Sequence, residues 1–376
     1  MSNANWRSEK RIGETFRKIL ALSFIFGCLS CTVVQAVSYT VIDLNPAGFI
    51  NTRGKGSGSS QQVGYGTTGG IKHALLWNSS ALGYVDLHPA SGYVNSYGYA
   101  ISGSQQAGAA FYSTTNKSHA MLWNGTNSSY VDLHPSSGYI SSIAYGINGT
   151  QQVGSGTSST GDHALLWSGT SASVVDLNPI GFTSSAANAT NGSQQVGYGS
   201  GTATSNQFRA ILWSGTKSGY VDLHPITGYS ASYALGISSS QQVGYGTSST
   251  GDHALLWSGS AASYIDLNPD GFKASGAYAT NGKQQVGEGT VTATGVHHAL
   301  LWNSSVGNFV DLHSFLSSNY TSSYAESIDS LGNVVGYAYD SNAGTYHAVL
   351  WQVPEPTTAM LIAAGMFFFS SRRRRK

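Results

Sequence analysis

Short apolar runs recur along this chain, separated by turns rich in serine, glycine and asparagine. Residues 73–77 read His-Ala-Leu-Leu-Trp, and Tyr-Val-Asp-Leu follows at 84–87 across a six-residue turn. Residues 233–237 and 241–245 flank a second, shorter turn. No window keeps apolar residues at the 3.6-residue spacing of an amphipathic helix, so the pattern predicts β-hairpins throughout.

The hairpins recur in seven units. Successive unit-ending tryptophans lie 46, 44, 46, 44, 45 and 49 residues apart, an aspartate keeps the same period, and Gln-Gln-Val-Gly or a variant stands between them. Four short strands in about 45 residues match one blade of a β-propeller. We therefore expect an all-β, seven-bladed β-propeller over residues 37–352. The markers are Trp77, Trp123, Trp167, Trp213, Trp257, Trp302 and Trp351, with Asp43, Asp86, Asp132, Asp176, Asp222, Asp266 and Asp311.

The two ends of the repeat region complement each other. The first unit starts at Val41-Ile42-Asp43-Leu44 with no apolar run before it, and no Val-Asp-Leu follows Trp351. We expect residues 347–351 to pair with residues 39–44, which would close the ring and remove exposed sheet edges. The alternative is an open β-solenoid, whose coils are usually shorter, about 20 to 30 residues.

Composition adds a contrast between the body and the ends. Only 9% of residues are charged, and residues 37–352 hold 8 basic and 14 acidic residues, a formal charge of −6. The body has no basic stripe, which excludes a nucleic-acid partner. Ten of the 18 basic residues lie at the two ends.

The N-terminal end is typical of an export signal. Basic residues precede an apolar stretch at 19–34, and Ala36 follows at a position suited to signal peptidase. We interpret residues 1–36 as a helical signal peptide cleaved after Ala36. Because Cys28 and Cys31 lie within it, the mature chain would contain no disulfide or thiolate metal site. A lipoprotein signal acylated at either cysteine and an uncleaved membrane anchor are the alternatives.

The C-terminal end has three parts. An apolar segment at 359–369 is preceded by Val353, Pro354, Glu355 and Pro356 and followed by Arg372, Arg373, Arg374, Arg375 and Lys376. This arrangement resembles the PEP-CTERM sorting signal of Gram-negative bacteria, which an exosortase recognises and cleaves. The resemblance implies a sorting segment over 353–376 that contacts the membrane through a short hydrophobic transmembrane helix. A plain membrane anchor is the alternative, and either would place the body at the cell surface or in the extracellular matrix.

The repeat itself resembles the HAF family of extracellular repeats. The shared sequences are His-Ala-Leu-Leu-Trp, Val-Asp-Leu, an Ala-x-x-Ile segment and Gln-Gln-Val-Gly, over nearly all of residues 39–351. Leucine or methionine replaces the phenylalanine of the family, and Arg209 replaces one histidine. The resemblance implies a secreted repeat protein and no defined activity.

The recurring histidines and aspartates are interpreted as structural. Equivalent residues of different blades are too far apart to bind one metal ion, and seven identical aspartates do not form an acid/base pair. Within a blade, however, His163 and Asp176 could meet and form a hydrogen bond. We expect no cofactor, metal or catalytic residue, and assign structural roles to His73, Trp77, Asp86, His163, Trp167, Asp176, His253, Trp257 and Asp266.

Residues that interrupt the repeat are better candidates for function, although each also fits a tolerated surface substitution: Arg209, Glu288, His297, Glu326 and Asp329. The favoured hypothesis is a non-enzymatic surface or matrix protein, processed by signal peptidase and exosortase, that binds extracellular polysaccharide in a biofilm or envelope through tyrosine, amide and hydroxyl groups. A polysaccharide-active propeller enzyme and an ice-binding protein are the alternatives.

Overall fold

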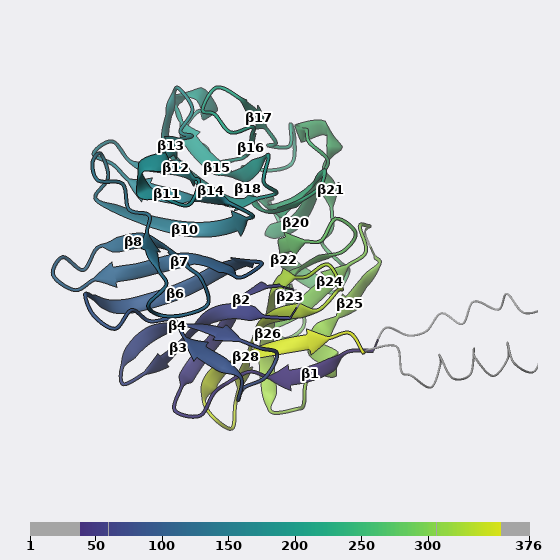
Figure 1. The fold of residues 1–376 in the computed structure, drawn as a ribbon. Coiled ribbons are helices and arrows are strands. Elements are labelled where there is room, and N and C mark those ends of the chain that lie inside the picture. Colours follow the sequence, from purple (N-terminus) through teal and green to yellow (C-terminus); the bar gives the residue numbers. More distant parts are fainter. Residues whose placement is uncertain (1–37, 59, 306, 355–376) are drawn as a thin grey trace, which may run out of the picture. The chain divides into compact units, whose positions relative to one another are not determined.

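Seven four-stranded antiparallel sheets form the body of the protein (Figure 1). The computed structural model describes residues 38–58, 60–305 and 307–354. The sheets are the blades of a propeller, and the first strand of each blade lines a central channel. The predicted seven-bladed β-propeller is therefore confirmed, and the solenoid alternative is wrong.

Six blades are continuous in sequence, with strands ordered from the channel outward. The first comprises β2 (Ile50–Ser57), β3 (Gln62–Thr68), β4 (Ile71–Trp77) and β5 (Tyr84–Asp86), and the second β6 (Tyr93–Ser102), β7 (Gln105–Tyr112), β8 (Ser118–Trp123) and β9 (Val131–Asp132). The third comprises β10 (Ser141–Asn148), β11 (Gln151–Thr157), β12 (Asp162–Trp167) and β13 (Val175–Asp176), and the fourth β14 (Phe182–Thr190), β15 (Gln195–Gly201), β16 (Arg209–Trp213) and β17 (Tyr220–Asp222). The fifth comprises β18 (Ala231–Ser238), β19 (Gln241–Thr247), β20 (Asp252–Trp257) and β21 (Ile265–Asp266), and the sixth β22 (Phe272–Thr280), β23 (Gln285–Val291), β24 (His297–Trp302) and β25 (Phe309–Asp311).

The seventh blade is completed by both ends of the repeat region. It contains β26 (Tyr320–Ile328), β27 (Val334–Asp340) and β28 (Thr345–Gln352), and its outer strand is β1 (Thr40–Asp43). Val41 pairs with Trp351 and Asp43 with Val349, as the incomplete terminal units predicted. The ring is thus closed by strand pairing instead of a covalent link.

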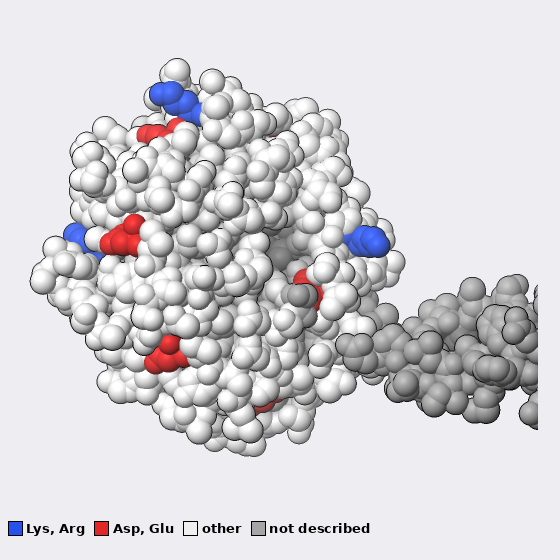
Figure 2. All heavy atoms as spheres, in the orientation of Figure 1, with Lys and Arg blue, Asp and Glu red and all other residues white. Residues whose placement is uncertain are grey.

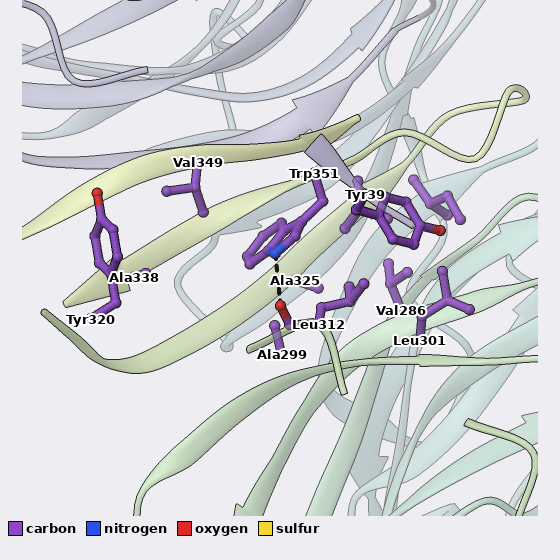
Figure 3. Packing of buried hydrophobic residues seen from close by; sticks show 12 residues of the cluster. Tyr39, Val286, Ala299, Leu301, Leu312, Tyr320, Ala325, Ala338, Val349 and Trp351 are labelled. Atoms are coloured by element: carbon purple, nitrogen blue, oxygen red, sulfur yellow. Dashed lines mark hydrogen bonds between the residues drawn. The ribbon is translucent and has the colours of Figure 1, made fainter. Parts of the chain in front are cut away.

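The hydrophobic core lies between neighbouring blades. Figure 3 shows one such cluster, in which Trp351 of β28 packs near Leu312 and Val286, and its indole Nε1 donates a hydrogen bond of 2.9 Å to the Leu312 carbonyl. All seven repeated tryptophans, including Trp77, Trp167 and Trp257, are fully buried. Because both faces of each third strand are covered by sheets, the run His-Ala-Leu-Leu-Trp is apolar on both faces.

The glycine of Gln-Gln-Val-Gly is required by close strand approach. A Cβ atom at Gly154 would collide with the carbonyl oxygen of Ile143 on the neighbouring strand. The strand register shifts beside this contact, between Ala144 and Gly146, which indicates a β-bulge in the channel-lining strand. The glycine therefore allows each innermost strand to bend beside the channel.

The helices of the described region are four short 3₁₀ turns, η1 (Ser171–Ser173), η2 (Thr202–Thr204), η3 (Ala261–Ser263) and η4 (Leu312–Phe315). In the portion of the chain described by the structure, no helix has the length and apolar character needed to cross a bilayer. The expected signal helix at 1–36 and the hydrophobic helix at 359–369 lie outside the described residues.

Candidate functional site

A side-chain pair joins the third and fourth strands of every blade. His163 Nδ1 lies 2.8 Å from Asp176 Oδ2, the contact expected from the sequence. The equivalent pairs are His73–Asp86 at 2.6 Å, His119–Asp132 at 2.7 Å, Arg209–Asp222 at 2.9 Å, His253–Asp266 at 2.7 Å, His298–Asp311 at 2.8 Å and His347–Asp43 at 2.8 Å. Since every blade has this pair, it belongs to the repeat and does not distinguish a site.

A second contact connects each blade to the next, and we call it the blade latch. His88 Nδ1 lies 2.9 Å from Ser96 Oγ of the following blade, and the same Oγ accepts a hydrogen bond of 2.8 Å from Ala74 N. Asparagine replaces the histidine in three latches, as in Asn178 Oδ1, which lies 2.6 Å from Ser185 Oγ. The other histidines are His134, His224 and His313, and the other asparagines are Asn45 and Asn268.

The latch histidines are neutral hydrogen-bond partners. Burial lowers the pKa of His88, and the adjacent His73 lowers it further. Burial is also the largest cause of the lowered pKa values of His134, His224 and His313. Within residues 38–58, 60–305 and 307–354, no group of three or more His, Cys, Asp or Glu side chains could hold a metal ion.

The innermost strands of the described propeller surround a central channel. Its volume is about 910 Å³, and all seven innermost strands line it. One equivalent position on each of these strands carries a side chain into the channel lining. We call these residues the channel ring: Lys55, Tyr99, Tyr145, Asn188, Leu235, Tyr278 and Glu326. Five residue types occupy the seven positions, whereas the core and latch positions are nearly constant.

A second variable position lies two residues earlier on the same strands. Where this position carries arginine or tyrosine, the side chain contacts the preceding blade and so bridges two blades beside the channel ring. Tyr97 lies 4.9 Å from the Tyr65 ring and under Lys72 Nζ at 5.3 Å. Tyr233 likewise lies 5.0 Å from Tyr198, measured between ring centroids. We call this set the bridging residues: Arg53, Tyr97, Ile143, Ala186, Tyr233, Gly276 and Tyr324.

Tyrosine is the most frequent residue at the channel-ring and bridging positions, and both positions of the second blade carry it. Tyr99 lies 5.9 Å from Tyr145 and is stacked with Tyr97 at 6.0 Å. Burial raises the pKa of Tyr99, and Tyr145 raises it further. The Tyr99 phenol therefore remains protonated at neutral pH and can donate a hydrogen bond to a ligand while its ring offers apolar surface.

Charged side chains gather in the sixth, seventh and first blades. Lys55 Nζ lies 2.5 Å from Glu326 Oε1, and His297 Nδ1 lies 2.5 Å from Glu288 Oε2. Tyr278 donates a hydrogen bond of 3.2 Å to Glu288 Oε1. Burial raises the pKa of Tyr278 well above its usual value, and the carboxylates of Glu288 and Glu326 raise it further. Elsewhere, charges are few and scattered on the face seen in Figure 2.

The structure separates the five residues that interrupt the repeat. Glu288 pairs with His297 and accepts a hydrogen bond from the channel-ring residue Tyr278, and Glu326 itself belongs to the channel ring. Arg209 instead takes the place of a histidine in the strand-joining pair. Asp329 caps a turn, because its Oδ1 accepts hydrogen bonds from the backbone N–H groups of Leu331 and Asn333, both 2.9 Å long.

Sequence reasoning did not identify Arg53, Lys55, Tyr97, Tyr99, Tyr145 or Tyr278 as site residues. Aligning the seven units on their Gln-Gln-Val-Gly sequences would have revealed them, because their positions vary from unit to unit. The missing signal was therefore variation between internal repeats, not a catalytic motif.

The expected sorting residues begin where the propeller ends. Val353 follows β28, and its backbone N donates a hydrogen bond of 2.9 Å to Asn333 Oδ1. Pro354 is the last described residue. Glu355, Pro356, Arg372 to Arg375 and the expected cleavage position Ala36 lie outside the described residues.

The C-terminal sequence matches a known family model. Residues 352–375 match the PEP-CTERM protein-sorting motif, as the three-part pattern predicted. The motif implies export, processing by an exosortase and sorting to the cell surface. No curated protein matches the chain.

Solved β-propellers resemble the body. The chain is similar to the β-propeller domain of the Trilobed protease from Pyrococcus furiosus, with 10% identity over 82% of this chain and 99% of that chain and a TM-score of 0.54. It is also similar to oligogalacturonate lyase from Vibrio parahaemolyticus, with 11% identity, coverage of 85% and 98%, and a TM-score of 0.53. At such identities the likeness shows the fold alone.

Proposed function

We propose that this chain is an exported, exosortase-sorted surface or matrix protein whose propeller binds exopolysaccharide without cleaving it. The binding surface comprises the channel ring and the bridging residues. The PEP-CTERM match supports the cellular address. Signal peptidase would act at the other end, and the resemblance to HAF repeats agrees with an extracellular role.

The variation of the channel ring carries this proposal. Residues 151–182 and 241–272 differ at only six positions, yet the preceding channel-ring residues of those two blades are Tyr145 and Leu235. A position that only built the blade would be expected to repeat as the buried tryptophans do. The ring is instead chemically diverse around a hollow of about 910 Å³, which suits recognition of an irregular ligand.

The side chains suit a sugar ligand. Sugars present apolar ring faces and many hydroxyl groups, and tyrosine offers both an apolar ring and a hydrogen-bonding hydroxyl. Asn188 and Tyr278 add further polar groups to the channel lining. An extended exopolysaccharide could thread a chain end or side branch into the channel while adjacent sugars contact the bridging residues.

A binding and cleavage assay tests the proposal. The full chain, purified in mild detergent, is titrated calorimetrically with exopolysaccharide from the producing bacterium, and reducing ends are measured in the same samples. Saturable binding without new reducing ends is expected. Absence of binding would contradict the proposal, and a time-dependent rise in reducing ends would establish an enzyme instead.

The sector of charged side chains in the sixth, seventh and first blades favours one second candidate, a polysaccharide-active enzyme. Glu288, His297 and Tyr278 are hydrogen-bonded in series, and Glu326 lies close enough to affect the pKa of Tyr278. Such groups can transfer protons to or from a sugar. If reducing ends do form, loss of that activity in both E288Q and H297N, with unchanged glycan affinity, would assign catalysis to this sector.

A further inference from the structure

We propose that the propeller recognises an acidic polysaccharide, and that Arg53 and Lys72 on the first blade bind its carboxylate groups. This inference rests on the proposed glycan-binding function and specifies its ligand. It starts from the uneven distribution of cations. Of the eight Lys and Arg residues in 37–352, three lie on β2 and β4 of the first blade: Arg53, Lys55 and Lys72.

The three cations differ in their partners. Lys55 is paired with Glu326 and is therefore not free to bind an anion. Among the residues that the structure describes, neither Arg53 nor Lys72 forms an ion pair with a carboxylate. Both instead rest against aromatic rings beside the channel ring.

Arg53 is held in place by two tyrosines of the seventh blade. Its Cζ atom lies 4.6 Å from the ring centroids of both Tyr337 and Tyr346. The two rings meet edge to face, with centroids 5.4 Å apart, so the guanidinium occupies the corner between them. This corner limits the conformations of Arg53 without neutralising its charge, which lowers the entropy lost when it binds a ligand.

Lys72 lies on the side of the first blade that faces the second blade, opposite to Arg53. Its Nζ lies 5.3 Å from the Tyr97 ring centroid, and the residue is exposed. The two cations are thus each placed beside a tyrosine, a combination that can contact a sugar ring and its charged substituent together. A carboxylate can accept two parallel hydrogen bonds from an arginine, which favours a uronate-type sugar over a neutral one.

The body as a whole is acidic, so its attraction for an acidic glycan is confined to individual cations. Residues 37–352 carry a formal charge of −6, so a polyanion is not attracted to the protein in general. Binding of an acidic glycan would therefore depend on the few cations that contact it. Substituting one of them should change the affinity measurably, whereas substituting a distant lysine should not.

The test uses two celluloses that differ in charge. Binding of the full chain to carboxymethyl cellulose and to uncharged hydroxyethyl cellulose is measured by calorimetry. Lys217 supplies the matched control, because K217Q removes the same charge from an exposed turn between β16 and β17. We expect preference for the carboxylated polymer, a roughly tenfold weaker affinity in R53Q, a smaller loss in K72Q and no change in K217Q.

Other outcomes separate this inference from the proposed function. Equal affinity for the two polymers, no binding to either, or unchanged affinity in R53Q and K72Q overturns the inference, even if exopolysaccharide still binds. K72Q keeps the test decisive should R53Q fail to fold, because Lys72 is exposed. Failure to bind the bacterium's own exopolysaccharide would instead overturn the proposed function.

Discussion

Lys55 and Glu326 form an ion pair across the seam where the first and seventh blades meet. Their Nζ and Oε1 atoms lie 2.5 Å apart, although the residues are 271 positions apart in sequence. The side chains are 21% and 15% exposed. The pair therefore joins two strands that are distant in the chain, and its two side chains are mostly shielded from water.

Removing one partner should destabilise the ring more than removing both. E326Q leaves the shielded Lys55 charge without its partner, and we expect the free energy of unfolding to fall by about 2 kcal/mol. K55M/E326M should recover most of that loss. Urea denaturation measures both values, and an equal loss in the single and double variants would show that the unpaired Lys55 charge is not what destabilises E326Q.

Breaking the strand that closes the ring should have a larger effect than breaking an equivalent outer strand. Ile42 of β1 pairs with Leu350, and Val175 of β13 pairs with Leu166. I42P should cost about 3 kcal/mol or more, because it also frees the N-terminal strand from the last blade. V175P disturbs a blade that is continuous in sequence. Thermal unfolding compares the two, and equal losses would argue against a special role for β1.

The blade latches predict that stability falls in mild acid. The pKa values of His88, His134, His224 and His313 are lowered in the fold, so near pH 6 the unfolded chain binds more protons than the folded chain. Stability from these groups is complete above the unfolded pKa of about 6.5 and is lost as pH falls through the folded values. His347, whose pKa is raised by its hydrogen bond to Asp43, opposes part of this trend.

Three natural latches supply the control for that prediction. Asn178 and two other asparagines make the latch without a titrating group. Substituting the four latch histidines with asparagine should flatten the pH dependence, whereas the parent protein should lose about 5 °C in Tm between pH 7 and pH 5. Differential scanning calorimetry measures both, and an unchanged slope in the fourfold variant would contradict the assignment.

The glycines of the Gln-Gln-Val-Gly sequences, which lie opposite the bulges, should tolerate no side chain. At Gly154 an added Cβ would strike the Ile143 carbonyl, so G154A should lower the free energy of unfolding by about 3 kcal/mol or prevent folding. Gly149 is the matched control: it has a φ of +55° and open space around it, so G149A should cost only about 1 kcal/mol. Equal effects in urea denaturation would mean that the strand can move away from Gly154.

Local patterns in the sequence were sufficient to predict the blades and their closure. Strand alternation, turn residues and the incomplete terminal units are all short-range signals, and Val41 pairs with Trp351 as they indicated. The channel site depends on the curvature of the ring, which brings Lys55 to Glu326 and Arg53 to Tyr337. No local pattern encodes those contacts. Glu288 and His297 were noticed only because they interrupt the repeat.

The most direct test of the account is whether the affinity of the protein for exopolysaccharide depends on two channel tyrosines. Calorimetry compares the parent chain with Y99A/Y145A, which empties two channel-ring positions, and with Y220A, which removes an exposed tyrosine from the outer strand β17. The account predicts roughly tenfold weaker binding in Y99A/Y145A and parent affinity in Y220A. Unchanged binding in Y99A/Y145A, with the variant folded, would contradict the claim that the channel is the binding site.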